Sequence, residues 1–143
     1  SANQANSAAS AAAAKADAID KTMKRIVYEV VLNEEEGNFA FGKTTLPDDA
    51  KSKLDQMITQ LKSDPKGAFF EIEGHTDNVG DKVYNEKLGL ERAEAVKRYL
   101  YEQHQIPLHK INVISYGEEK PVAPNNTRQG RAQNRRVVVR VLS

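Results

Sequence analysis

Short apolar runs alternate with amphipathic stretches along most of the chain. The runs are rich in β-branched and aromatic residues and predict four β-strands, at residues 26–32, 68–73, 111–116 and 137–142. Apolar positions at helical spacing predict two main helices, at about 47–63 and 85–104. A further extended segment is expected at 38–41 and a short helix at 127–133. This alternation favours a two-layer α/β sandwich over separate helical and sheet domains.

The second predicted strand shows how the sheet should be buried. Side chains alternate between the two faces of a strand, so Phe70 and Ile72 share one face. Phe69, Glu71 and Glu73 share the other. We therefore expect one face of the sheet to lie under helices and the other to be partly exposed to water.

The first 25 residues differ from the rest, because they contain almost no large side chains and ten of the first 20 are alanine. Alanine is the best helix former, and neither Gly nor Pro occurs before Gly37. We expect an Ala-rich helical arm (1–25) followed by one domain (26–143). A solvated spacer is the alternative. A heptad that would allow self-association as a coiled coil runs through Ala5, Ala9, Ala12, Ala16, Ile19, Met23 and Ile26.

Composition narrows the classes of function. The chain has 143 residues, 21 Lys and Arg, 20 Asp and Glu, and no Cys, which excludes disulfides, thiolate zinc sites and cysteine nucleophiles. Its near-neutral charge argues against a nucleic-acid partner, although residues 121–143 hold five arginines and no acid. No apolar run reaches the ~18–20 residues of a membrane helix. The chain also begins without an export signal, and we expect a processed start.

Neither catalysis nor metal binding is indicated. The three histidines His75, His104 and His109 lack i, i+4 spacing, so no metal site is expected. The nucleophile motif GxSxG is absent. Glu71 and Glu73 lie on one strand face, whereas an acid/base pair needs carboxylates that face each other across a cleft. We expect a binding protein without a cofactor.

Arg92 is the most informative position in the second helix. It lies four residues after Leu88 and four before Val96, in the middle of the apolar stripe. A guanidinium on this inward face must pair with an anion or reach water at the edge of the core. Both a structural salt bridge and a ligand site fit this pattern.

The polar loop at residues 74–80 offers an anion for Arg92. Asp77 follows a buried strand and precedes the helix that carries Arg92. A carboxylate beside a guanidinium makes a receptor for a zwitterion, since the acid takes an ammonium and the guanidinium takes a carboxylate through two hydrogen bonds.

Four motifs resemble the OmpA-like (OmpA C-terminal) peptidoglycan-binding family, over about residues 39–142. They are EGHTD at 73–77, LGLERA at 88–93, SYGEEKP at 115–121 and NRRV at 134–137. The resemblance implies an α/β sandwich with a mixed sheet of about four strands and two main helices. It also implies non-covalent binding of peptidoglycan through the diaminopimelate of its stem peptide, with Asp77 and Arg92 holding the charged end.

The resemblance also suggests weaker contacts around the same groove. Many members have an acid where this chain has Gly42. Asn85 is expected to cap the second helix as well. One of Arg135 and Arg136 is expected to pair with Glu71 or Glu73. The weaker candidates are Phe41, Thr44, Thr76, Asn85, Leu88 and Arg136.

The family is found in the bacterial cell envelope, so the resemblance implies a periplasmic location, attachment to the outer membrane and a membrane anchor upstream of this chain. Two alternatives remain. One is a scaffold that oligomerises through the Ala-rich arm, and the other is a MotB-like stator anchor.

Overall fold

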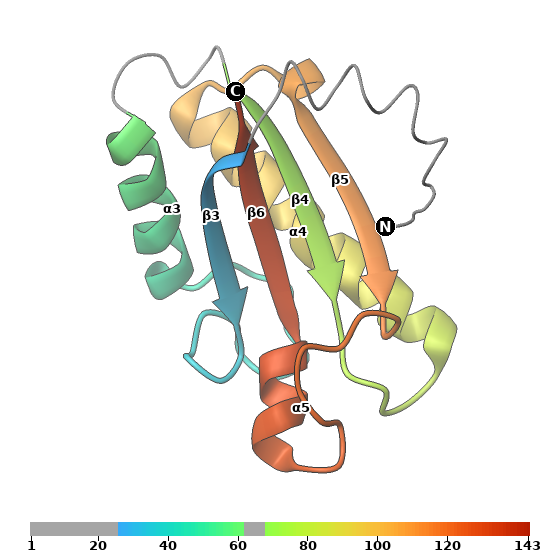
Figure 1. Ribbon diagram of the computed structural model, residues 1–143. Coiled ribbons are helices and arrows are strands. Elements are labelled where there is room, and N and C mark those ends of the chain that lie inside the picture. Colours follow the sequence, from blue (N-terminus) through green and yellow to red (C-terminus); the bar gives the residue numbers. More distant parts are fainter. Residues whose placement is uncertain (1–25, 62–67) are drawn as a thin grey trace.

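The computed structural model describes residues 26–61 and 68–143. Its centre is a four-stranded sheet in the order β3-β6-β4-β5 (Figure 1). The predicted Ala-rich helix and the end of the first main helix lie outside the described residues, so the proposed boundary at residue 25 stays a prediction. The heptad lies outside them as far as Met23, but its last position is wrong, because Ile26 is the first residue of a strand. The strands are β3 (Ile26–Asn33), β4 (Phe69–His75), β5 (Ile111–Gly117) and β6 (Arg136–Leu142).

The sheet is mixed. β6 runs antiparallel to both of its neighbours, β3 and β4, whereas β4 and β5 are parallel. Parallel neighbours need a long crossover, and α4 (Lys82–His104) supplies it. The other helices are α3 (Asp48–Leu61), the 3₁₀ helix η2 (Leu108–Lys110) and α5 (Arg128–Asn134). The predicted α/β sandwich is confirmed.

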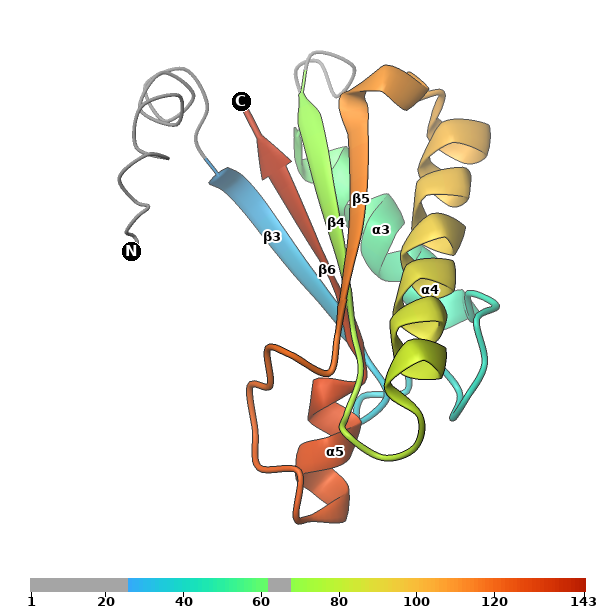
Figure 2. The same ribbon diagram turned by 90° about the vertical axis from the view of Figure 1, so that its right-hand side faces the viewer.

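Figure 2 shows that α3 and α4 cover one face of the sheet, while α5 lies beyond one end of the strands. On the covered face, Phe70 and Ile72 are buried as predicted. They pack in one core with Val139 of β6, Leu54 of α3 and Val96 of α4.

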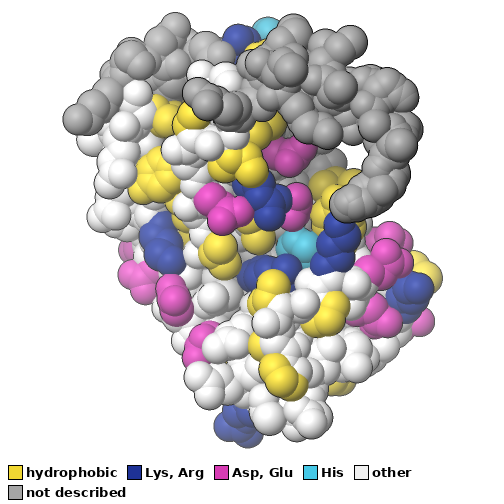
Figure 3. Space-filling model, in the orientation of Figure 1, with side chains coloured by type: hydrophobic (Ala, Val, Ile, Leu, Met, Phe, Trp, Pro, Cys, Tyr) yellow, Lys and Arg dark blue, Asp and Glu magenta, His cyan; other side chains and the backbone are white. Residues whose placement is uncertain are grey.

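The other face of the sheet carries paired charges. Figure 3 shows acidic and basic side chains side by side there, among hydrophobic ones. The Arg140 guanidinium donates to Glu29 at 2.8 Å and also to Glu73. The expected pairing of Arg135 or Arg136 with Glu71 or Glu73 is therefore wrong, because the register places Arg140 on this face opposite both Glu29 and Glu71.

The predicted extended segment at 38–41 is wrong. The chain leaves β3 through turns, with Gly37 at a positive φ of 79°. The Asn38 side-chain oxygen accepts from the Asn33 backbone N–H at 3.1 Å, and the Asn38 N–H donates to the Asn33 carbonyl. These bonds close the turn locally, so no strand partner is needed.

The start of α4 also differs from the expectation. The helix begins at Lys82, and the Asp81 carboxylate caps it by accepting from the Tyr84 N–H at 2.9 Å. Asn85 is therefore not the cap, and its side chain is free to bind the preceding loop.

Two glycines let α4 approach β4 closely. A Cβ built on Gly74 would lie 2.0 Å from the carbonyl oxygen of Gly89, which no side chain permits. The glycines of the EGHTD and LGLERA motifs therefore set the spacing between β4 and α4, and so the position of the loop that follows β4.

Candidate functional site

A cavity of about 530 Å³ lies at the end of the sheet where β4 stops. Four segments line it: the turns after β3, the loop after β4, the first turns of α4, and α5 with the residue that follows it. The lining residues are Phe41, Gly42, Thr76, Asp77, Val79, Tyr84, Asn85, Leu88, Arg128, Arg131 and Arg135.

The register of the sheet explains why these segments meet. Arg136, the first residue of β6, is paired with Asn33 on one side and His75 on the other. The residues just after β3, just after β4 and just before β6 therefore lie at the same end of the sheet. They include Glu34, Asp77 and Arg135, which are far apart in the sequence.

Five of the residues predicted from the sequence line this cavity: Asp77, Phe41, Thr76, Asn85 and Leu88. Arg92, Thr44 and Arg136 do not. Arg136 is buried and donates to the carbonyls of Asn134 and Lys120, which ties the start of β6 to the loop before α5.

Asp77 is held in place by its own loop. Its carboxylate accepts from the Val79 N–H at 3.0 Å and from the guanidinium of Arg135. The Asn85 side chain donates to the Val79 carbonyl at 2.9 Å, and the Thr76 N–H donates to the Gly117 carbonyl at 2.8 Å. The Asp77 carboxylate is thus fixed on the cavity wall before any ligand arrives.

Arg135 connects Asp77 to the turn after β3. Its Nε donates to Glu34 at 2.6 Å, and its guanidinium lies 5.1 Å from the centre of the exposed Phe41 ring. Burial lowers the pKa of Arg135, but hydrogen bonds to Glu34 and Asp77 outweigh burial and raise the pKa overall. Arg135 therefore stays charged and bridges two acids.

Arg92 is fully buried, so the sequence correctly indicated that it needs an anion. Its partner, however, is Glu34, at 2.5 Å, and not Asp77. The guanidinium also donates to the carbonyls of Lys43 at 2.7 Å and Ala40 at 3.1 Å. Burial lowers the pKa of Arg92, against the opposing effect of Glu34.

One nitrogen of Arg92 is unused. Among the described residues, its Nη1 is buried without a hydrogen-bond acceptor. Arg92, Glu34, Arg135 and Asp77 thus form a chain of alternating charges that runs from the core to the cavity wall. Asp77 and Arg92 belong to one network but do not touch within it.

Arg128, Arg131 and Arg135 are residues that sequence reasoning missed as cavity residues, together with Val79 and Tyr84. The three arginines are spaced i, i+3 and i+7, which places them on one side of a helix. This spacing could have been recognised within the basic stretch 121–143. The sequence alone did not show that α5 packs over the end of the sheet, beside Asp77.

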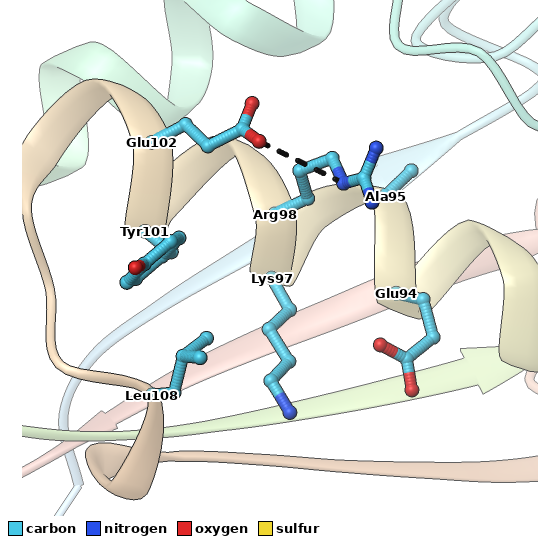
Figure 4. Close-up of a pocket in the computed structure, with 7 residues that line it drawn as sticks. All are labelled: Glu94, Ala95, Lys97, Arg98, Tyr101, Glu102 and Leu108. Atoms are coloured by element: carbon cyan, nitrogen blue, oxygen red, sulfur yellow. Dashed lines mark ion pairs between the residues drawn. The ribbon is translucent and has the colours of Figure 1, made fainter.

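A second hollow lies on the exposed side of α4 and η2 (Figure 4). Its one ion pair, between Arg98 and Glu102 at 3.9 Å, is an exposed i, i+4 pair. Tyr101 and Leu108 are both nearly half exposed there. No buried polar group faces this hollow in the described part of the chain, so the cavity beside Asp77 is the stronger candidate.

Within residues 26–61 and 68–143, no group of three or more His, Asp or Glu side chains is placed to hold a metal ion. Over the same residues, every helix is too short or too polar to cross a bilayer.

Known proteins are similar to this chain in both sequence and fold. The chain is 36% identical over 115 residues to outer membrane porin F of Pseudomonas aeruginosa, covering 80% of this chain and 33% of the porin. It is 42% identical over 102 residues to the peptidoglycan-associated lipoprotein of Pseudomonas putida, covering 71% of this chain and 60% of the lipoprotein. It thus spans about a third of the porin and less than two thirds of the lipoprotein.

The fold matches the crystal structure of the peptidoglycan-associated lipoprotein from Burkholderia pseudomallei. The TM-score is 0.66 at 33% identity, over 78% of this chain and 88% of that one. The OmpA family matches residues 38–135, a range that includes every residue lining the cavity. The resemblance seen in the four motifs is confirmed, and this chain belongs to the OmpA family.

Proposed function

We propose that this chain binds peptidoglycan non-covalently, through the diaminopimelate of the stem peptide, and so tethers a membrane-anchored protein to the cell wall. The observation that carries the proposal is the Asp77 carboxylate, fixed on the wall of a cavity beside arginine guanidinium groups. The free end of diaminopimelate has an ammonium and a carboxylate on one carbon. A fixed acid next to fixed bases is complementary to that zwitterion.

Asp77 takes the ammonium in this proposal. Each oxygen of its carboxylate accepts one hydrogen bond in the structure, from the Val79 N–H and from Arg135. A carboxylate offers about four acceptor positions, so both oxygens can accept again. The ammonium can therefore bind without displacing Arg135.

Arg92 takes the carboxylate through Nη1. A buried donor without an acceptor costs about 1–3 kcal/mol, and a ligand oxygen would remove that cost. The Ala40 and Lys43 carbonyls now hold the guanidinium, so the turn at residues 40–44 has to shift for the ligand to reach it. Arg135 lines the cavity already and is a second hydrogen-bond donor for the same carboxylate.

The remaining candidates close the sides of the site. Phe41, Thr76, Asn85 and Leu88 line the cavity, and Thr44 belongs to the turn that must shift. Arg136 contributes by holding the loop before α5 rather than by touching the ligand.

Periplasmic location and outer-membrane attachment are part of the proposal. The names of the relatives, an outer membrane porin and two peptidoglycan-associated lipoproteins, support both. Since this chain spans only part of the porin and of the Pseudomonas putida lipoprotein, the anchor is assigned to a segment upstream of it.

The substitution Asp77→Asn tests the site. It removes the charge that attracts the ammonium and keeps the shape, and Arg135 retains Glu34. Binding to isolated peptidoglycan sacculi should fall by about ten-fold or more, with the melting temperature changed by only a few degrees. Glu91→Gln, an exposed acid on α4 outside the cavity, is the matched control. Equal pull-down by Asp77→Asn and wild type would contradict the assignment.

A crystal soak with diaminopimelate would show whether Arg92 or Arg135 binds the ligand carboxylate. The proposal expects the ammonium at Asp77 and the carboxylate at Arg92 Nη1. A carboxylate found at Arg135 alone would remove Arg92 from the site while leaving Asp77 in it.

A further inference from the structure

We infer that Arg128 and Arg131 form a second anion subsite, which binds another carboxylate of the same stem peptide. This inference rests on the proposed function and extends it. The two arginines project from α5 into the cavity that Asp77 lines.

α5 is held firmly over the end of the sheet. The Thr127 side chain caps it by accepting from the Gly130 N–H at 2.9 Å. A Cβ on Gly130 would lie 1.9 Å from the Pro124 carbonyl oxygen, so the helix packs directly on the preceding loop. The buried Asn134 side chain accepts from the Val122 and Ala123 N–H groups. The backbone positions from which Arg128 and Arg131 project are therefore fixed.

The charges facing the cavity are not balanced. Three arginines and one aspartate line it, and Asp77 is already paired with Arg135. Arg131 donates to the Asn125 carbonyl at 3.0 Å and has no acidic partner among the described residues. Arg128 is exposed, and its side chain has neither an ion pair nor a hydrogen bond within the same part of the chain.

The excess charge has a consequence for the ligand. A zwitterion brings no net charge, so diaminopimelate's free end alone leaves Arg128 and Arg131 uncompensated. A ligand with an additional anion would satisfy them, and a guanidinium fork matches a carboxylate through two parallel hydrogen bonds.

The spacing suits a neighbouring residue of the peptide. Arg131 lies four residues before Arg135, ~6 Å along the helix axis. One to two residues of extended peptide span ~3.5–7 Å. In a stem peptide whose glutamate is linked through its γ-carboxyl group, the α-carboxylate of that glutamate is free and lies next to diaminopimelate. We assign this carboxylate to the subsite.

The test uses two synthetic tripeptides of L-alanine, γ-linked D-glutamate and diaminopimelate. One has the free α-carboxylate of glutamate, and the other has it as an amide. In titration calorimetry, the wild-type chain should bind the acid about three- to ten-fold more tightly than the amide. Arg128→Gln with Arg131→Gln should bind both peptides alike, with the affinity that wild type has for the amide.

Arg98→Gln on the far side of α4 is the matched control and should keep the preference for the acid (Figure 4). Arg128→Gln alone removes no side-chain hydrogen bond or ion pair of the described residues and should lower the preference without any effect on folding. Equal affinity of wild type for both peptides would overturn the subsite and leave the proposed function intact. Equal weakening of both peptides by the double variant would also overturn it. Failure of wild type to bind either peptide would overturn the proposed function and the subsite together.

Discussion

At the scale of single residues, Glu34 is the centre of the charge network. Its side chain is only 5% exposed and accepts from Arg92 and from Arg135. Removing one partner of a buried ion pair leaves the other charge in a poorly solvated place. Glu34 pairs with two arginines, so its loss should disturb both Arg92 in the core and Arg135 on the cavity wall.

The substitution Glu34→Gln should lower the free energy of unfolding by ~3–5 kcal/mol, because Arg92 is left buried with an uncompensated charge. Urea unfolding at neutral pH measures this. Glu36→Gln is the control, since Glu36 forms an exposed pair with Lys53 at 3.0 Å and its loss should cost under ~1 kcal/mol. Similar costs for the two variants would show that Glu34 is not needed to balance Arg92.

At the scale of elements, the contact of α4 with β4 depends on backbone approach. Gly74→Ala should destabilise by about 1–3 kcal/mol, because the added Cβ meets the fixed carbonyl of Gly89. Gly89→Ala should cost less. Its nearest neighbour is the Ser115 hydroxyl, at 2.6 Å, and alanine favours the helix by about 0.8–1 kcal/mol over glycine. Thermal unfolding of both variants gives the order, and the reverse order would contradict the packing argument.

A second contact between elements joins α3 to α4. The Tyr99 hydroxyl donates to Asp55 at 2.7 Å, and His104 lies 2.8 Å from the same oxygen. Burial and the bond to Asp55 raise the pKa of Tyr99 to about 12. A raised pKa in the folded state means that the contribution of Tyr99 is complete below its ordinary pKa of 10.0 and is lost as pH rises toward about 12.

The variant Tyr99→Phe should therefore be less stable than wild type by ~1 kcal/mol at neutral pH. The difference in unfolding free energy between the two proteins should shrink between pH 10 and pH 12, as wild type loses the bond and the variant has none to lose. Denaturant titrations across this range measure the difference. If the difference in unfolding free energy stays constant up to pH 12, the pKa of the Tyr99 hydroxyl does not change on folding.

At the scale of the whole molecule, the cavity can be tested apart from the Ala-rich arm. Among the residues that the structure describes, those that line the cavity lie between Phe41 and Arg135. A chain of residues 26–143 should therefore bind sacculi as well as the full chain does, within about two-fold, because it keeps every residue known to line the cavity. Pull-down of both chains measures this, and loss of binding in the shorter chain would place part of the site in the arm.

Sedimentation of the same two chains tests the alternative of an oligomerising scaffold. Self-association of residues 1–143 but not of 26–143 would favour it. Two monomers would exclude it for this chain.

Local pattern was sufficient to predict the order of the elements and the buried face of the sheet. Phe70 and Ile72 show why, since the period of two along a strand is a property of neighbouring residues. The same reasoning failed at 38–41. The apolar residues there resemble a strand, but hydrogen bonds between Asn38 and Asn33 close a turn instead. It also failed at Asn85, because the better cap, Asp81, lies one turn earlier.

The sequence by itself determined that Arg92 lies on an inward helix face and needs an anion, because helix periodicity and the cost of an unpaired buried charge are local matters. Only the tertiary structure decided which acid pairs with Arg92. Glu34 lies 58 residues from Arg92, and Arg135 lies 58 residues from Asp77. Glu34, Asp77 and Arg135 meet because β6 starts where β3 and β4 end, and this register is set by pairing across the whole sheet.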